Sequence, residues 1–193
     1  MSTVKASFQT IMAAAEALIQ EKGCRQTTLQ DIIRHTGMSK GAIYHYVSSK
    51  DELFALVLKS RVEQMNAKFA EVVTRPDTAG LGSPLKLIAE GIIRSTNHQD
   101  VSNKIFIYLL SQMDNPKIEA MVQNMYQFTL QTCTNWVEVG KLHKVIPAEV
   151  DGSKVSEFLT MFMYGMRVNN TIVQGQSKMT AEDLIALMTK ALG

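Results

Sequence analysis

Residues 36–54 read TGMSKGAIYHYVSSKDELF, and this stretch decides how the whole chain is interpreted. Tyrosine, histidine, lysine and glycine lie together within about two helical turns, a mixture that a helix buried in a core does not use. Ser39 can cap a short helix that ends around Val47. Ser49 and Glu52 have the spacing of a capping box, which predicts the start of a further helix. The stretch therefore predicts a short helix with an exposed face, followed at once by another helix.

Two helices are predicted before this stretch. Apolar residues at three- and four-residue spacing indicate a helix from about Val4 to Lys22, and Gly23 suits its left-handed cap. Thr28 can cap a second, short helix, which must end near Gly37 because glycine accepts the positive φ of a tight turn. Two short helices joined by a glycine turn form a helix-turn-helix, whose second helix enters the major groove of DNA.

The rest of the chain keeps the helical pattern. The helix that begins after Ser49 continues to about Thr74, and the following residues, RPDTAGLGSP, hold two prolines and two glycines, as a linker does. No run with a period of two is bounded by turn residues, so no sheet is expected. The fold class is all-α with about nine helices, and the remaining ones are predicted at 84–96, 101–113, 116–140, 153–174 and 181–192. We expect a helix-turn-helix DNA-binding domain at 1–48 and a larger helical effector-binding and dimerisation domain at 49–193, with 50–74 as the linking helix.

Composition narrows the class of protein. The 193 residues are 46% hydrophobic and 20% charged, as in a folded globular protein. The net charge is only +2, but residues 22–50 hold five lysines and arginines against the single acid Asp31, a local charge of +4 (five minus one). Such a segment is typical of a nucleic-acid partner, although a solvated face without a partner gives the same pattern.

Cysteine usage and hydropathy indicate where the protein acts. Cys24 and Cys133 are far apart and lack metal-ligand spacing, which favours a reducing cytosol. The N-terminus has no signal-peptide pattern, and the most apolar run, FLTMFMYGM from Phe158, is too short to span a bilayer. We expect a cytoplasmic protein without a structural disulfide, a metal site or a cofactor.

The side chains of the helix-turn-helix suit a DNA partner. Hydroxyl caps and the amides of helix starts bind phosphate oxygens, glycine permits close approach to the duplex, and lysine reaches a guanine edge or a phosphate. Tyrosine and histidine carry a polar tip on an aromatic body. Ile43 and Val47 are expected in the core, and Tyr46 fits either role. The predicted DNA-binding residues are Thr28, Ser39, Lys40, Gly41, Tyr44, His45 and Lys50.

The stretch from Ile11 to Phe54, IMAAAEALIQEKGCRQTTLQDIIRHTGMSKGAIYHYVSSKDELF, resembles the DNA-binding domain of the tetracycline-repressor-like (TetR) family of bacterial regulators. It is about the first quarter of the chain, and KG, TT, DI, TGMSKGAIYHY and SKDEL lie in register. The resemblance implies nine or ten helices, a variable ligand-binding domain and a symmetric homodimer formed by the last two long helices. It also implies that Thr27 and Ala42 face DNA. Ala42 replaces a frequent hydroxyl, which implies a change in the bases that are read.

The region after the linker is rich in methionine and aromatic residues. Methionine adapts to irregular apolar shapes, so a pocket for a small hydrophobic or aromatic effector is predicted. The alternative is that these residues are ordinary core, which helical spacing alone does not exclude. Glu138, His143 and Glu157 do not form a metal-ligand set. The candidate pocket residues are Phe106, Met113, Met125, Phe128, Trp136, Met163 and Arg167.

The segment 155–166 is apolar around nearly its whole circumference, so its own domain and something else must cover it. A second copy of the chain is the simplest cover, and a twofold dimer predicts a palindromic operator. The candidate interface residues are Phe158, Phe162, Met166, Leu184, Leu187 and Met188.

The function predicted from these patterns is a dimeric transcriptional repressor that a small effector releases from its operator. No GxSxG, P-loop or HExxH motif is present in the sequence, so no enzyme is expected. Two alternatives stay open. One is a small-molecule binding protein without sequence-specific DNA binding, and the other is a DNA-binding regulator that needs no ligand.

Overall fold

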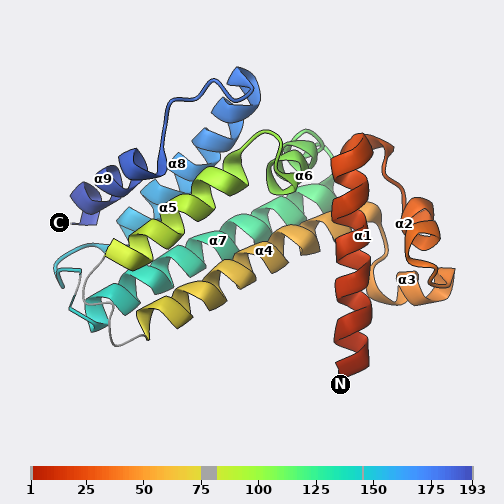
Figure 1. Cartoon of the computed structure of the whole chain (residues 1–193), viewed down its shortest axis with the longest axis horizontal. Coiled ribbons are helices and arrows are strands. Elements are labelled where there is room, and N and C mark those ends of the chain that lie inside the picture. Colours follow the sequence, from red (N-terminus) through yellow and green to blue (C-terminus); the bar gives the residue numbers. More distant parts are fainter. Residues whose placement is uncertain (1, 75–81, 145, 193) are drawn as a thin grey trace. The chain divides into compact units, whose positions relative to one another are not determined.

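The computed structural model describes residues 2–74, 82–144 and 146–192, and within these ranges every regular element is a helix (Figure 1). The all-α prediction is confirmed. The predicted linker lies mostly outside the described residues. The helices are α1 (Ser2–Gln26), α2 (Leu29–Thr36), α3 (Lys40–Tyr46), α4 (Lys50–Val73), α5 (Gly82–Thr96), α6 (Val101–Leu110), α7 (Pro116–Leu142), α8 (Gly152–Val173) and α9 (Ala181–Leu192).

The chain divides into two compact units that are not single stretches of sequence. The first comprises Met1–Ser60 and Gln99–Met125, and the second comprises Arg61–His98 and Tyr126–Gly193. Helices α4 and α7 each begin in the first unit and end in the second. Helix α6, far along the chain, packs on α1 and joins the first unit, and the domain boundary expected at residue 48 stays a prediction.

The first unit is built around the apolar face of α1. Ile11 and Ile19 are fully buried there, as are Ile32 of α2, Ile43 of α3 and Phe54 of α4. Their burial fixes the three N-terminal helices and the start of α4 around one core. Gly23 has a φ of 81°, which breaks α1 where the sequence predicts its end, and one more turn follows to Gln26.

The second unit has its own apolar core, and α5 packs there on α8 and α9. Three residues expected at a dimer interface lie inside this unit instead: Met166, Leu184 and Met188 are 7%, 1% and 2% exposed. Leu184 and Met188 form the inward face of α9, so their side chains fill the core of their own chain. The buried cluster is Phe69, Leu85, Ile88, Ala89, Val137, Ile146, Leu184, Met188 and Leu192.

The start of α4 carries a modified capping box. The Ser49 hydroxyl accepts from the Glu52 amide at 3.1 Å, as predicted. The Glu52 carboxylate, however, accepts from the amide and the hydroxyl of Ser48, both at 2.7 Å, rather than from Ser49. These bonds lower the pKa of Glu52. Over the described ranges, none of the helices is both long enough and apolar enough to cross a bilayer.

Candidate nucleic-acid interface

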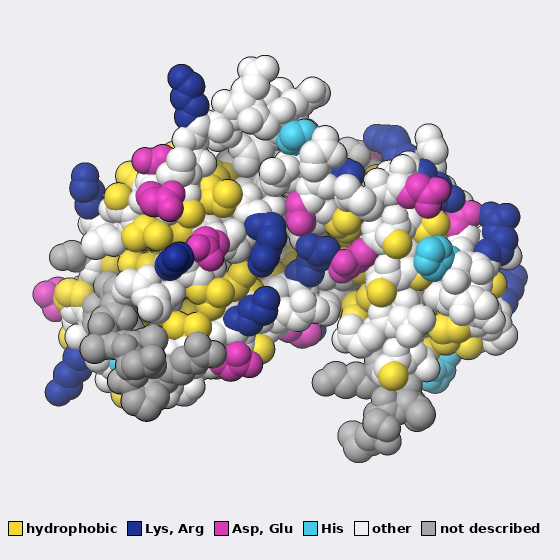
Figure 2. Space-filling model, in the orientation of Figure 1, with side chains coloured by type: hydrophobic (Ala, Val, Ile, Leu, Met, Phe, Trp, Pro, Cys, Tyr) yellow, Lys and Arg dark blue, Asp and Glu magenta, His cyan; other side chains and the backbone are white. Residues whose placement is uncertain are grey.

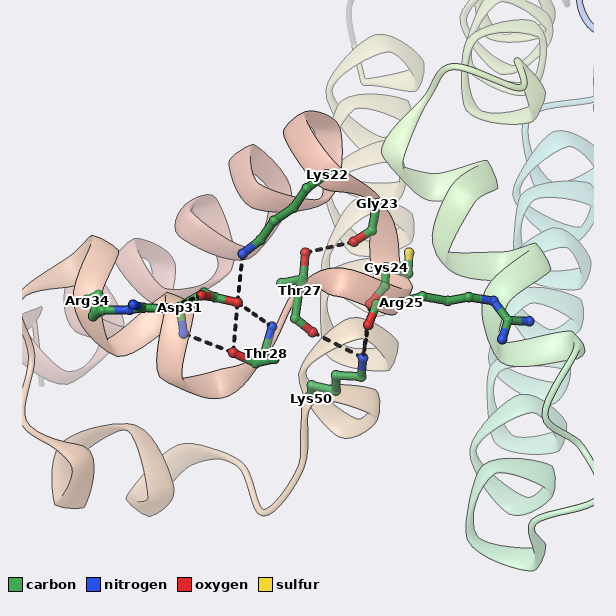
Figure 3. A network of polar contacts seen from close by, with 9 residues as sticks. All are labelled: Lys22, Gly23, Cys24, Arg25, Thr27, Thr28, Asp31, Arg34 and Lys50. Carbon is green, nitrogen blue, oxygen red and sulfur yellow. Dashed lines mark hydrogen bonds and ion pairs between the residues drawn. The ribbon is translucent and has the colours of Figure 1, made fainter.

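The start of α2 is closed by a complete capping box (Figure 3). The Thr28 hydroxyl accepts from the Asp31 amide at 3.1 Å, and the Asp31 carboxylate accepts from the Thr28 amide at 2.9 Å. The backbone amides of Thr28 and Asp31, which no helical carbonyl can pair, are each bonded by the side chain of the other residue. The local sequence is therefore sufficient to start this helix. Thr28 itself is exposed at the tip of the helix.

Asp31 also forms ion pairs with Lys22 and Arg34, as the dashed lines in Figure 3 show. Lys22 Nζ lies 2.8 Å from Asp31 Oδ2, and Arg34 Nη2 donates to Asp31 Oδ1. The contacts with Lys22 and Thr28 hold the pKa of the Asp31 carboxyl well below its usual range. The network ties the end of α1 to α2, and the sequence pattern alone does not identify Lys22 as its member.

A left-handed glycine sets the direction of α3. Gly37 has φ 68° and ψ 5°, and its amide donates to the Ile33 carbonyl, so α2 ends where the sequence predicts. Ser39 then caps α3, and its hydroxyl accepts from the Ala42 amide at 3.2 Å. Ile43 and Val47, one turn apart, are buried. The opposite face of α3 must therefore point away from the core.

That opposite face carries the residues predicted to read DNA. Lys40, Gly41, Tyr44 and His45 are all exposed, and Tyr44 keeps 47% of its surface. The Lys40 ammonium lies 5.6 Å from the centre of the Tyr44 ring, a cation–π distance that keeps both groups on the same surface. Ala42 is half-buried at the edge of this face.

Gly41 has a further property that only the structure shows. A methyl group added at this position would meet no atom within 4 Å, and φ here does not lie in the left-handed region. Neither packing nor backbone conformation within the chain requires a glycine at this point of the helix. Because Gly41 has no side chain, nothing projects from the exposed face of α3 between Lys40 and Tyr44.

Tyr46, which the sequence leaves open, holds α3 in place. Its ring stacks on Phe8 of α1 with centroids 5.4 Å apart and meets His45 edge to face at 5.3 Å. Half-buried between these neighbours, it positions His45 rather than presenting a free surface.

Thr27 and Lys50 occupy positions different from those expected of DNA contacts (Figure 3). Thr27 is fully buried, and its hydroxyl donates to the Gly23 carbonyl at 2.9 Å. The Lys50 ammonium donates to the carbonyls of Cys24, Arg25 and Thr27 at 3.0, 3.1 and 3.1 Å. An ammonium has only three N–H donors, so this arrangement leaves none for a phosphate. Lys50 instead closes the C-terminal end of α1, where a positive charge is favourable.

Tyr108 of α6 adds to the contacts that Lys50 makes at the start of α4, and no sequence pattern predicts it. We call these contacts of Lys50, Asp51 and Tyr108 the anchor of α4. Its hydroxyl donates to the Asp51 carboxylate at 2.8 Å, and the Lys50 ammonium lies 5.3 Å from its ring centre. Its ring also meets Phe54 edge to face at 5.8 Å. Burial, together with Asp51, raises the pKa of Tyr108 to about 12, so the hydroxyl keeps its proton.

The seven residues predicted to line an effector pocket fall in both units. Phe106, Met113 and Met125 belong to the first, and Phe128, Trp136, Met163 and Arg167 belong to the second. Trp136 packs within the second unit: its ring stacks on Phe69 at 5.1 Å, and its indole N–H donates to the Asn66 side chain at 2.9 Å. Arg167 is 7% exposed and donates to the Ser95 carbonyl at 2.9 Å.

Comparison with known proteins agrees with this geometry. The family model of bacterial regulatory proteins, tetR family, matches residues 11–57, the helix-turn-helix and the start of α4. The uncharacterized HTH-type transcriptional regulator YfiR of Bacillus subtilis is 23% identical over 135 residues, 67% of this chain and 63% of YfiR. The HTH-type transcriptional repressor KstR2 of Mycobacterium tuberculosis is 30% identical over 63 residues, 33% of this chain and 32% of KstR2. The matches thus span less than two thirds of either relative.

Solved structures extend the likeness over the whole fold. The structure of the SmeT–triclosan complex superposes with a TM-score of 0.67, covering 96% of this chain and 91% of SmeT, at 16% identity. At this identity the likeness concerns the fold alone. The helical region behind the helix-turn-helix therefore has the same architecture as that of SmeT.

Proposed function

Because residues 11–57 match the family model of bacterial regulatory proteins, tetR family, we propose that this chain is a DNA-binding repressor of that family and not an enzyme. In this proposal it binds a palindromic operator as a homodimer and is released by a small hydrophobic or aromatic effector. The exposed face of α3 is the observation that carries the proposal. The name of KstR2, a transcriptional repressor, supports the sign of the regulation.

The exposed face of α3 supports binding in the major groove. Lys40 suits the O6 and N7 acceptors of guanine or a phosphate, and the Tyr44 and His45 tips offer both donors and acceptors. The caps Thr28 and Ser39 are exposed at the two helix starts, where amides favour phosphate oxygens. Gly41 lets the helix approach the duplex closely.

An exposed apolar stripe on α8 supports the dimer. Phe158, Met161, Val168 and Ile172 recur at helical spacing and are 53%, 56%, 41% and 73% exposed in the single chain. On the face drawn in Figure 2, hydrophobic side chains also gather over α5, α8 and α9. Apolar residues gathered on one exposed face mark an interaction surface more often than scattered ones do, and a twofold partner would cover this stripe. Leu187 of α9, 47% exposed, extends the surface.

Release by an effector is supported by the course of α4. This helix begins at Lys50, directly after α3, and its second half belongs to the second unit. A molecule that binds the second unit and favours another position of α4 would change the spacing of the two α3 helices. SmeT, which has the same fold, was solved as a complex with triclosan. Such a regulator acts in the bacterial cytoplasm, where its operator lies.

The experiment that tests the proposal is a fluorescence anisotropy titration with DNA from the region upstream of the gene. The double variant Lys40→Ala/Tyr44→Ala should lose operator affinity by about 100-fold or more, since two groups that reach base edges are removed. Lys178→Ala, which removes an exposed lysine of the second unit, should bind like the wild type.

The outcomes separate the three candidate functions. Equal operator affinity of the double variant and the wild type would exclude α3 as the recognition helix. Binding that random competitor DNA abolishes would favour a small-molecule binding protein without sequence-specific recognition. Specific binding that no effector changes would favour a regulator that needs no ligand.

A further inference from the structure

A row of polar side chains lies between α7 and α8 of the second unit. On α7 the positions are separated by three and four residues, and on α8 by four and three, so each set occupies one helix face. We name this row the α7–α8 polar seam. It consists of Tyr126, Thr129 and Cys133 on α7 and Thr160, Tyr164 and Arg167 on α8.

Side-chain contacts show that the two faces meet. The rings of Tyr126 and Tyr164 lie edge to face with centroids 5.9 Å apart. The Thr129 side chain is hydrogen-bonded to Tyr164, and the Thr160 side chain to the Cys133 thiol. Helix pairs in a bundle normally meet through apolar residues, and bundles build their ligand sites from polar side chains on facing helices.

Three of the six residues of the seam are buried, the other three are half-buried, and the seam carries one positive charge. Thr129, Thr160 and Arg167 are 6%, 0% and 7% exposed. Burial raises the pKa of Tyr164 and of Cys133, so both keep their protons at neutral pH. Among the six residues of the seam, only Arg167 is therefore charged, and Tyr164 beside it has a hydroxyl that can donate.

The end of α5 holds the Arg167 guanidinium in place. One of its N–H groups donates to the Ser95 carbonyl at 2.9 Å, and the Asn170 amide nitrogen donates to the Thr96 carbonyl at 3.2 Å. Both bonds occupy carbonyls at the C-terminal end of α5, where the helix dipole favours a cation. The charge is thus fixed in position before any ligand arrives, as preorganised binding requires.

Asn170 gives a second, independent sign of a ligand. Because a carbonyl can only accept, the Thr96 carbonyl fixes the amide nitrogen of Asn170 on its side, and the oxygen Oδ1 must point elsewhere. This oxygen is buried, and no donor among the described residues reaches it. Buried acceptors in folded proteins nearly always have a donor, so this one calls for a donor from outside the chain.

We propose that the α7–α8 polar seam, together with Asn170, binds the head group of an amphiphilic organic anion. Its carboxylate or sulfonate group accepts from Arg167 and from the Tyr164 hydroxyl, and an N–H or O–H of the same molecule donates to Asn170 Oδ1. The body of the molecule lies against the rings of Tyr126 and Tyr164. This inference rests on the proposed function, since it assigns a chemical class to the effector of the regulator.

A matched pair of fluorescent probes tests the charge preference on the full chain. 8-Anilinonaphthalene-1-sulfonate and N-phenyl-1-naphthylamine share the same rings and the same N–H group, and only the first carries a sulfonate. The variants are Arg167→Gln, Arg167→Lys, Tyr164→Phe and, as the control, Arg94→Gln, which removes an exposed arginine of α5. Thermal unfolding of each variant checks that it is folded.

The sulfonate probe should lose at least about tenfold in affinity for Arg167→Gln, because a buried charged hydrogen bond is removed. Arg167→Lys should retain more of the affinity, Tyr164→Phe should lose about threefold to tenfold, and Arg94→Gln should be unchanged. The neutral probe should bind all variants alike. Equal losses for both probes, or no loss for the sulfonate probe in a folded Arg167→Gln, would overturn the proposal. If Arg167→Gln does not fold, an unchanged sulfonate affinity of both Tyr164→Phe and Arg167→Lys overturns it.

Operator binding measured in the same samples separates the two proposals. If the wild type binds its operator but does not distinguish the two probes, only the organic-anion site fails. If the wild type prefers the sulfonate probe but binds no operator, the repressor function fails and the anion site stands.

Discussion

The exposed faces of α3 and α8 differ in chemistry although both lie on the surface of the single chain. On α3 the exposed residues are Lys40, Gly41, Tyr44 and His45, and on α8 they include Phe158 and Ile172. The first face offers hydrogen bonds and positive charge, which suits the hydrated and charged DNA groove. The apolar stripe of α8, beside which Glu157 and Asn169 are also exposed, suits a surface that another protein removes from water. Exposure alone therefore does not distinguish the two roles, and the type of side chain does.

The two regions also differ in how they are held. The helix-turn-helix is closed by short-range bonds: Thr28 pairs with Asp31 three positions on, and Ser39 with Ala42 three positions on. On the inner face of α8, Arg167 donates a hydrogen bond to the Ser95 carbonyl, 72 positions away. Short-range bonds can be predicted from a local pattern, whereas a bond across 72 positions depends on the complete fold.

The largest expected effect tests the apolar face of α8. In Phe158→Glu/Ile172→Glu, each subunit places two charges where a partner would bury them, so the dimer dissociation constant should rise by about 100-fold or more. Analytical ultracentrifugation measures it. Leu142→Glu is the matched control, because Leu142 at the end of α7 is 78% exposed but lies outside the stripe. A control variant that dissociates, or a double variant that stays dimeric, would contradict the proposed interface.

The next effect tests whether Lys50 belongs to the anchor of α4 or to the DNA surface. Lys50→Met keeps the length of the side chain and removes three charge-assisted hydrogen bonds, so the free energy of unfolding should fall by about 2–3 kcal/mol. Urea unfolding measures this loss, and Lys68→Met, an exposed change on the same helix, should alter stability by less than about 0.5 kcal/mol.

The salt dependence of operator binding gives the second readout for Lys50. A lysine on a phosphate contributes about one unit to the slope of log affinity against log salt, and its removal reduces the slope. Because the Lys50 ammonium bonds to carbonyls, we expect the slope of Lys50→Met to equal that of the wild type. A slope reduced by about one unit would show that Lys50 contacts a DNA phosphate.

Two glycine substitutions in the helix-turn-helix separate the stability of the fold from the affinity for the operator. Gly41→Ala should raise the free energy of unfolding by about 0.5–1 kcal/mol, since alanine favours a helix and nothing obstructs the new methyl group. It should nevertheless weaken operator binding severalfold. Gly37→Ala should instead destabilise by about 1 kcal/mol, because Gly37 has a left-handed φ of 68°. A Gly41→Ala protein that binds its operator as well as the wild type would show that close approach at Gly41 is not needed.

The smallest effect is a change of stability with pH, which begins only in acid and tests the Asp31 network. The pKa of Asp31 is lower in the folded protein than in the unfolded chain, so its charge stabilises the fold above the unfolded pKa, near 4. That contribution is lost as the pH falls below this value. The difference in melting temperature between the wild type and Asp31→Asn should be constant from about pH 7 to pH 5 and shrink towards pH 2. Asp114→Asn, an exposed change in the turn before α7, should show no such trend.

Much of the fold and of the exposed face of α3 could be predicted from local pattern. Residue types at fixed short spacings predict the break of α1 at Gly23, the end of α2 at Gly37, the cap at Ser39, and the buried pair Ile43 and Val47. With the buried pair placed, the exposed face of α3 follows from helical geometry. The predicted end of α6 at residue 113 was too late, because the helix stops at Leu110 and turns before Pro116.

The sequence by itself determined the all-α class, the helix-turn-helix and which face of each short helix is apolar, because these depend on bonds and periodicities that span a few residues. Tertiary structure alone decided what covers each face. Met166, Leu184 and Met188 are covered by their own chain, the Lys50 ammonium is satisfied by the end of α1, and Tyr108 meets Asp51 from 57 positions away. The periodicity of apolar and polar residues indicates that a side chain needs a partner. Which residue is that partner depends on how distant helices pack together.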